Sequence, residues 1–134
     1  MLFNTEKKSN KNDKPFFLNL SNNKPSLLEK TIVEISLNQI FNDDMKTEDE
    51  CFITEVREAD ITGKLNTGQE YSYSDWKNAV HTMMSRALES EDTEKRSGNI
   101  RIIPIVDRAY YKSGILTVGF NKKLNLRDVY DSYQ

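Results

Sequence analysis

The side chains best suited to chemistry are gathered in one short segment between two apolar runs near the C-terminus. Arg108, Tyr110, Tyr111 and Lys112 follow one another there within "RAYYK". Guanidinium and ammonium groups bond phosphate oxygens, and tyrosine hydroxyls add further contacts of this kind along a nucleic-acid backbone. An ordinary exposed loop has the same composition. The segment therefore supports two interpretations, a contact with phosphate and a solvated turn.

The distribution of charge favours an anion as a partner more than the net charge of −2 does. Residues 95–127 hold eight basic residues and one acid, a balance of +7, whereas residues 43–60 hold eight acids and two bases, a balance of −6. Residues 1–25 carry five lysines and two acids, a balance of +3. A basic block on an acidic chain predicts a local positive surface, although solubility alone also produces uneven blocks.

Catalytic and metal-binding side chains are scarce. His81 is the only histidine and Cys51 the only cysteine, so the chain holds no conventional zinc site of Cys and His. There is no glycine-rich phosphate loop, and the acidic run at 43–50 lacks the spacing of a calcium loop. Trp76, Met83 and Met84 have the spacing of a helix core. We therefore expect a protein that is not an enzyme and needs no metal or cofactor.

The same composition points to the cytoplasm. No apolar run approaches the roughly 18 residues of a membrane-spanning helix, and the first residues lack the apolar core of a signal peptide. A single cysteine excludes an internal disulfide and fits a reducing compartment. At 134 residues the chain is long enough for one domain with a buried core. We expect a flexible arm over residues 1–14 and a folded domain over 15–134.

Three helices are predicted ahead of the basic segment. Ser26 with Glu29 forms a capping-box pattern at the start of the first, over residues 26–41. A short strand at 51–53 and a helix capped by Thr54 and running to Leu65 follow. The clearest helix covers residues 72–91, with Ser72 and Asp75, or Ser74 itself, as its cap. Residues 121–134 form the start of another helix or a linker.

The basic segment joins two predicted strands, over residues 98–107 and 114–120. Helix, short strand, helix, helix, strand, strand is the order of a winged helix, an α+β fold in which a three-helix core carries a β-hairpin wing. In this fold the short strand after the first helix completes a small sheet with the wing. The N-terminal stretch at 15–20 is predicted to be extended and to dock on the core.

The first strand of the hairpin is apolar on both faces. Ile102 and Val106 lie on one face and Ile103 and Ile105 on the other, and Pro104 belongs at an edge or a bulge because it cannot donate to a ladder. Either the segment at 15–20 or a second subunit covers the second face. The second alternative predicts a homodimer with an interface formed by Ile102, Ile103, Pro104, Ile105 and Val106.

Four segments in this order resemble the replication-initiator (Rep) proteins of iteron plasmids: "SLLEKTIVEISLNQI", "FITEVREADITG", "DWKNAVHTMMSRALE" and "IRIIPIVDRAYYKSGILTVGFNKKLNLRDVY". The resemblance covers about residues 16–130 and is to the first of that family's two winged-helix domains. It implies a bacterial, plasmid-associated protein. In that family, the first domain dimerises and contacts phosphate, and the second reads iteron sequence. Dimers repress at an inverted operator, and monomers bind iterons to start replication.

On this basis we expect double-stranded plasmid DNA, a second copy of the chain and host replication proteins as partners, and no membrane. The family's second winged helix is expected to be absent from this chain. The residues expected to contact the DNA backbone, chosen by charge and position, are Arg101, Arg108, Lys112, Lys122 and Lys123. The alternative functions are a winged-helix transcription regulator and a protein-interaction module with no role on DNA.

Overall fold

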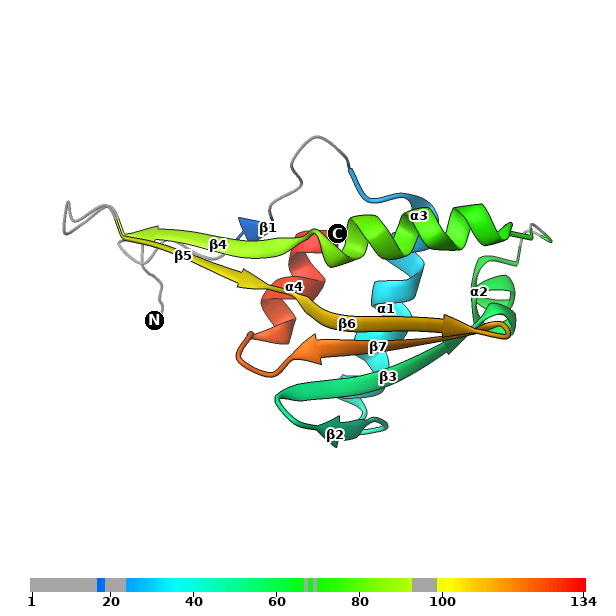
Figure 1. The fold of residues 1–134 in the computed structure, drawn as a ribbon, viewed down its shortest axis with the longest axis horizontal. Coiled ribbons are helices and arrows are strands. Elements are labelled where there is room, and N and C mark those ends of the chain that lie inside the picture. The colour runs from blue at the N-terminus through cyan, green and yellow to red at the C-terminus, as the bar shows by residue number, and fades with distance from the viewer. Residues whose placement is uncertain (1–16, 19–23, 67, 69, 93–98) are drawn as a thin grey trace, which may run out of the picture.

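The computed structural model describes residues 17–18, 24–66, 68, 70–92 and 99–134; for 17–18, 90–92 and 99–101 it describes the backbone alone. The described helices are α1 (Leu27–Phe41), α2 (Glu58–Leu65), α3 (Tyr73–Met84) and α4 (Leu126–Tyr133). The strands are β1 (Phe17–Leu18), β2 (Lys46–Glu48), β3 (Cys51–Arg57), β4 (Ala87–Asp92), β5 (Asn99–Pro104), β6 (Val106–Lys112) and β7 (Ile115–Asn121). Figure 1 shows their arrangement.

A four-stranded antiparallel sheet in the order β2-β3-β7-β6 forms the body of the molecule with the helices (Figure 1). Alternate side chains of β7, at Leu116, Val118 and Phe120, are fully buried in a core that α1, α3 and α4 also supply. The opposite face carries exposed side chains such as Tyr110. The predicted pairing of the strand after α1 with the wing is confirmed, because β3 pairs with β7 from Cys51 to Arg57.

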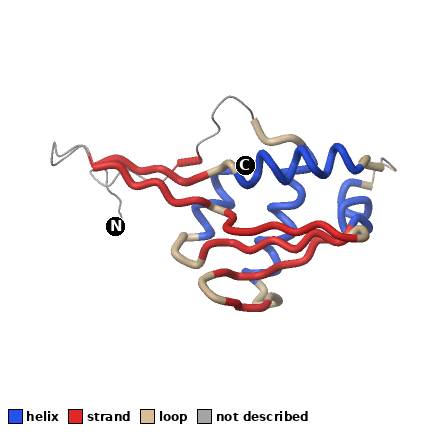
Figure 2. Tube along the Cα trace, in the orientation of Figure 1, coloured by secondary structure: helices blue, strands red, loops and turns tan. Residues whose placement is uncertain are grey.

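A second sheet, in the order β1-β4-β5, extends away from the helices as a narrow ribbon (Figure 2). Its strand β4 corrects the prediction of one helix over residues 72–91: α3 ends at Met84, and Ala87 and Leu88 pair with β5 instead. The apolar spacing of Ala87 and Leu88 continues the helical stripe, so the local pattern alone could not reveal the change. On its other edge β4 pairs with Phe17–Leu18, which confirms an extended N-terminal segment docked on the fold.

The predicted hairpin of residues 98–120 is also built differently. The first apolar run divides at Ile105, where the chain passes from β5 in one sheet to β6 in the other. The predicted loop at 108–113 is mostly strand β6, and the turn is confined to Ser113 and Gly114, with φ of 53° and 80°. Glycine adopts this left-handed conformation without strain, and here it allows a tight connection between β6 and β7.

Of the predicted starts of α2 and α3, the first is wrong and the second is confirmed. Thr54 does not cap α2: it is buried within β3, which runs four residues further than expected, and α2 begins at Glu58. Ser72 and Asp75 form the predicted reciprocal capping box of α3, each side chain accepting from the other's backbone N–H. The residues after the wing form a helix, α4, capped by Asn125.

The start of α1 differs in one important detail. Ser26 accepts a hydrogen bond from the Glu29 N–H, as expected. The Glu29 carboxylate, however, lies in the core, where it accepts hydrogen bonds from Arg86, Thr82 and Tyr133. A buried charge is tolerated only when it is paired and hydrogen-bonded, and this network meets that condition while joining α1 to the end of α3 and to α4.

Candidate nucleic-acid interface

The tip of the β6–β7 wing is fastened to two helices by Tyr111. The Tyr111 ring stacks on buried Trp76 of α3, with centroids 5.2 Å apart, and its hydroxyl donates to Glu58 Oε2 of α2 at 2.5 Å. Chiefly because of that hydrogen bond, and then of burial, the pKa of Tyr111 is raised to about 12. The wing and the two helices therefore form one rigid end of the molecule.

Two cations flank Ile115 on the open face of the sheet at this end, one on each neighbouring strand. In the strand register, Lys112 of β6 is paired with Ile115 of β7, which is in turn paired with Arg57 of β3. Both cations are exposed, and Arg57 also lies 3.6 Å from the exposed carboxylate of Glu55. The role of Arg57 was missed in the sequence because that residue was expected in a helix, where strand register gives no information.

Arg108 lies on the same face, about 13 Å from Lys112 if each of four residues advances the strand by about 3.3 Å. Its side chain crosses β7 over Gly119 to reach the turn between β2 and β3. There Nη1 donates to Glu48 Oε1 at 3.2 Å and Nη2 to Asp49 Oδ2 at 3.1 Å. The pKa of Arg108 is raised, first by its hydrogen bond with Asp49.

Gly119 makes this crossing possible. A Cβ at position 119 would lie 2.7 Å from Arg108 Cγ, closer than side-chain contacts allow, and 3.2 Å from Ile53 Cδ1, a tight contact that a small shift relieves. The aliphatic stem of Arg108 thus occupies the space that any larger residue would need. The guanidinium is consequently directed along the open face toward the acidic turn.

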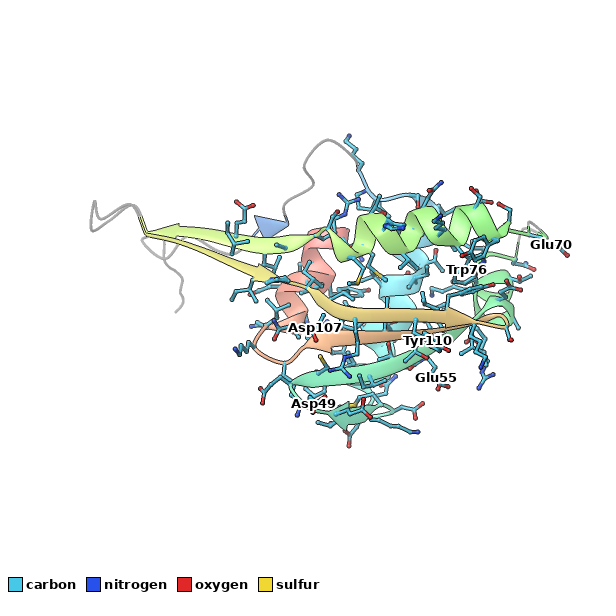
Figure 3. The ribbon with its side chains drawn as sticks, in the orientation of Figure 1. Asp49, Glu55, Glu70, Trp76, Asp107 and Tyr110 are labelled. Carbon is cyan, nitrogen blue, oxygen red and sulfur yellow. The ribbon has the colours of Figure 1, made fainter. Side chains whose placement is uncertain are left out.

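The remaining predicted phosphate contacts fall in different places. Lys122 follows β7 and lies near the same acidic turn, with Nζ 3.5 Å from the Asp49 carbonyl oxygen and 5.7 Å from the centre of the Phe52 ring. Lys123 is exposed beside it. The side chain of Arg101 lies outside the described residues. The fold thus brings Arg108 and Lys122 together at Asp49 and places Lys112 apart at the wing tip; Asp49, Asp107 and Tyr110 mark this face in Figure 3.

The exposed surface of α3, the third helix of the winged-helix core, carries little net charge. Its exposed residues include Tyr73, Asp75, Lys77 and His81, with Tyr73 69% exposed at the first helical position. A helix that reads bases in a major groove presents side chains that bond base edges, together with cations for the backbone. With one lysine and one aspartate, the exposed surface of α3 offers almost no net positive charge for the DNA backbone.

The predicted dimer residues divide into two groups. Ile102 is 58% exposed on β5, Ile103 is half-buried against the core, and Pro104 is exposed. Ile105 and Val106 are buried in the chain's own core, at 0% and 2% exposure. Their inclusion in an interface is therefore corrected: the run is apolar on both faces partly because it supplies two sheets, each with its own buried side.

Within the part of the chain that the structure describes, no group of three His, Cys, Asp or Glu side chains is placed to hold a metal ion. Cys51 is buried, and its thiol lies 3.5 Å from Asp107 Oδ2; burial, followed by this contact, raises its pKa. None of the described helices is long and apolar enough to cross a membrane.

The three helices α1, α2 and α3, a strand that pairs with the wing, and the β6–β7 hairpin define a winged-helix domain of the α+β class. The model of the initiator replication protein family, WH1, matches residues 12–126 of the chain. The chain belongs to this family and is the N-terminal winged-helix domain of a plasmid replication initiator. A search of curated proteins found no match.

Proposed function

We propose that this domain supports plasmid replication and its autoregulation in two ways: it holds two initiator chains together, and it contacts the phosphate backbone of origin or operator DNA without reading base sequence. Neither role requires catalysis. Membership of a replication-initiator family makes duplex DNA the expected partner. The weak charge of α3 argues against base readout by this domain as the main source of affinity.

The observation that carries the DNA role is the wing tip. Lys112, at the end of the hairpin, and Arg57, at the adjoining end of β3, are exposed on one face of the sheet, where Tyr111 holds the hairpin against α2 and α3. A sheet end with two positioned cations suits a duplex backbone, because phosphate contacts depend on positioned charge and carry no sequence information directly. Acidic residues nearby, including Glu58 and Asp60, limit the strength of this contact.

The dimer role rests on strand β5. It forms one edge of the ribbon, because the order of that sheet is β1-β4-β5, and it carries Ile102, the most exposed large aliphatic side chain described. An exposed strand edge with an apolar side chain is a template for pairing with another chain. We infer that a second copy pairs along this edge and covers Ile102.

Binding of the chain to duplexes of unrelated sequence, measured by fluorescence anisotropy over a salt series, tests the DNA role. For about two to four phosphates neutralised, the slope of log K against log salt should be about −2 to −4. Lys112→Ala should weaken binding to all the duplexes equally and reduce the steepness of the slope by about one. Lys30→Ala, which removes an exposed cation from α1, is the matched control and should have a smaller effect.

Absence of binding at low salt would overturn the DNA role and favour the alternative of a protein-interaction module. Strong preference for one duplex, lost on substitution within α3, would instead favour a winged-helix regulator that reads bases itself.

A further inference from the structure

We propose that the turn between β2 and β3 is an intramolecular competitor of DNA: the carboxylates of Glu48 and Asp49 occupy the guanidinium of Arg108, and a DNA phosphate gains this cation only by displacing them. The inference rests on the proposed contact between this domain and the DNA backbone. It adds a built-in restraint on affinity at one end of the open sheet face.

The geometry of the contact is that of an occupied anion site. Two nitrogens of the Arg108 guanidinium each donate to a different carboxylate, at 3.2 Å and 3.1 Å, and Nε lies 3.8 Å from Asp107 Oδ2. The planar fork of arginine binds two oxygens of a phosphate in the same manner. The carboxylate oxygens of Glu48 and Asp49 therefore stand where phosphate oxygens would stand.

Neighbouring groups make the corner suitable for a phosphate once the acids leave. Lys122 Nζ is 3.5 Å from the Asp49 carbonyl, so a second cation borders the same turn. Gly119 leaves room for the Arg108 stem to lie flat across β7, which directs the guanidinium to this corner. With both acids in place, three carboxylates surround Arg108, and its guanidinium is occupied by protein oxygens rather than available to a phosphate.

The contact is also weak enough to exchange. The side chains of Arg108, Glu48 and Asp49 are 41%, 68% and 73% exposed. Ion pairs this exposed are screened by water and salt and contribute little to stability. A polyanion can thus displace the carboxylates with no change in the core. An ion pair that only pins the β2–β3 turn to the sheet is the competing explanation, and it predicts no effect on DNA binding.

The test compares four chains on one 20-base-pair duplex of arbitrary sequence at about 50 mM salt: the unaltered chain, E48Q/D49N, R108A and the triple variant. Removing the two charges should tighten binding about threefold to tenfold and steepen the salt slope by about one, the effect of one more phosphate contact. R108A alone should change binding less than twofold. In the triple variant the gain should disappear, because the released cation is absent.

The matched control is E34Q/D131N. It removes the same charge from α1 and α4, helices that carry none of the proposed phosphate contacts. Thermal melts establish that each variant is folded. A gain of equal size in E34Q/D131N, or one that persists in the triple variant, would show that the effect comes from net charge alone and would overturn the inference. No change in E48Q/D49N would overturn it directly, whereas absence of binding by all chains would instead reject the DNA role itself.

Discussion

Arg86, which lies between the end of α3 and β4, forms a buried ion pair with Glu29 in the first turn of α1. Arg86 Nε donates to Glu29 Oε2 at 3.1 Å and Nη2 to Oε1 at 3.0 Å, with both side chains at most 1% exposed. Tyr133 of α4 donates to the same carboxylate at 2.7 Å. Through Glu29, these contacts join α1, the segment after α3 and α4. Both hairpins, β4–β5 and β6–β7, lie between Arg86 and Tyr133 in the chain, so the contacts join the two ends of the segment that carries them.

Removing one partner of this pair should be strongly destabilising. Glu29→Gln leaves the Arg86 guanidinium buried opposite a neutral amide, and breaking a buried pair in this way costs about 3–5 kcal/mol. Urea denaturation followed by circular dichroism measures the loss. Glu34→Gln, which breaks the exposed pair with Lys64 on the same helix, is the control and should cost at most about 1 kcal/mol. Equal losses in the free energy of unfolding from the two substitutions would mean that the buried pair stabilises the fold no more than the exposed pair does.

The hydroxyl of Tyr111 should titrate late. Its hydrogen bond to Glu58 raises its pKa to about 12, against about 10 in an unfolded chain. The folded state therefore keeps the proton that the unfolded state releases, so the stability from this group is complete below about pH 10 and is lost as pH rises toward 12. The difference in absorbance at 295 nm between the unaltered chain and Tyr111→Phe gives the titration of this residue.

The Glu58→Gln variant is the check on the cause. Without the carboxylate the midpoint should move down toward the ordinary value, and alkaline unfolding between pH 10 and 12 should become less steep. A midpoint already near 10 in the unaltered chain would show that the wing tip is not held by this hydrogen bond in solution.

Self-association should depend on Ile102. Lysine at this exposed position of β5 adds charge to a strand edge, which opposes pairing with another chain. Sedimentation at micromolar concentration should give about twice the chain mass for the unaltered protein and the mass of one chain for Ile102→Lys. Leu27→Lys is the control, because Leu27 is 56% exposed but lies on α1. A monomer at millimolar concentration, or dissociation by both variants, would contradict an interface on β5.

Local rules predicted the parts of this fold that local contacts decide. Ser72 and Asp75 satisfy each other's backbone within four residues, so the start of α3 was predicted correctly. Its end was missed because Ala87 and Leu88 fit a helix or a strand equally well, and pairing with β5 decides between the two. The capping pattern at Ser26 was only half correct for a related reason: the partner that draws Glu29 into the core is 57 residues away.

In the candidate interface, too, the features that depend on neighbours in the sequence were predicted and those that depend on distant residues were not. The exposure of Lys112 could be predicted from its place next to a turn, and it is exposed. The acids that hold Arg108 could not be found in this way, because Glu48 and Asp49 are 60 and 59 residues distant and reach Arg108 only through the pairing of β3 with β7. Charge counted along the chain assigned the acids and the arginine to separate blocks, whereas the sheet places them in contact.

The last prediction concerns Gly119, whose missing side chain leaves the space that the Arg108 stem fills. A Cβ there would stand 2.7 Å from Arg108 Cγ, so Gly119→Ala must push the arginine stem aside. Overpacking of this kind costs about 1–3 kcal/mol, and replacing glycine by alanine within a strand returns about 0.5–1 kcal/mol. A net loss of about 1 kcal/mol is expected in urea denaturation.

Combining this substitution with Arg108→Ala separates the two causes of that loss. Without the Arg108 stem the nearest atom to the added methyl group is Ile53 Cδ1, at 3.2 Å, and the end of that side chain can shift by a few tenths of an ångström. Gly119→Ala should therefore cost less in the Arg108→Ala background, with a coupling of at least about 0.5 kcal/mol between the two sites. An equal cost in both backgrounds would locate the need for glycine in the backbone of β7. The Arg108 side chain would then reach Glu48 and Asp49 without help from Gly119.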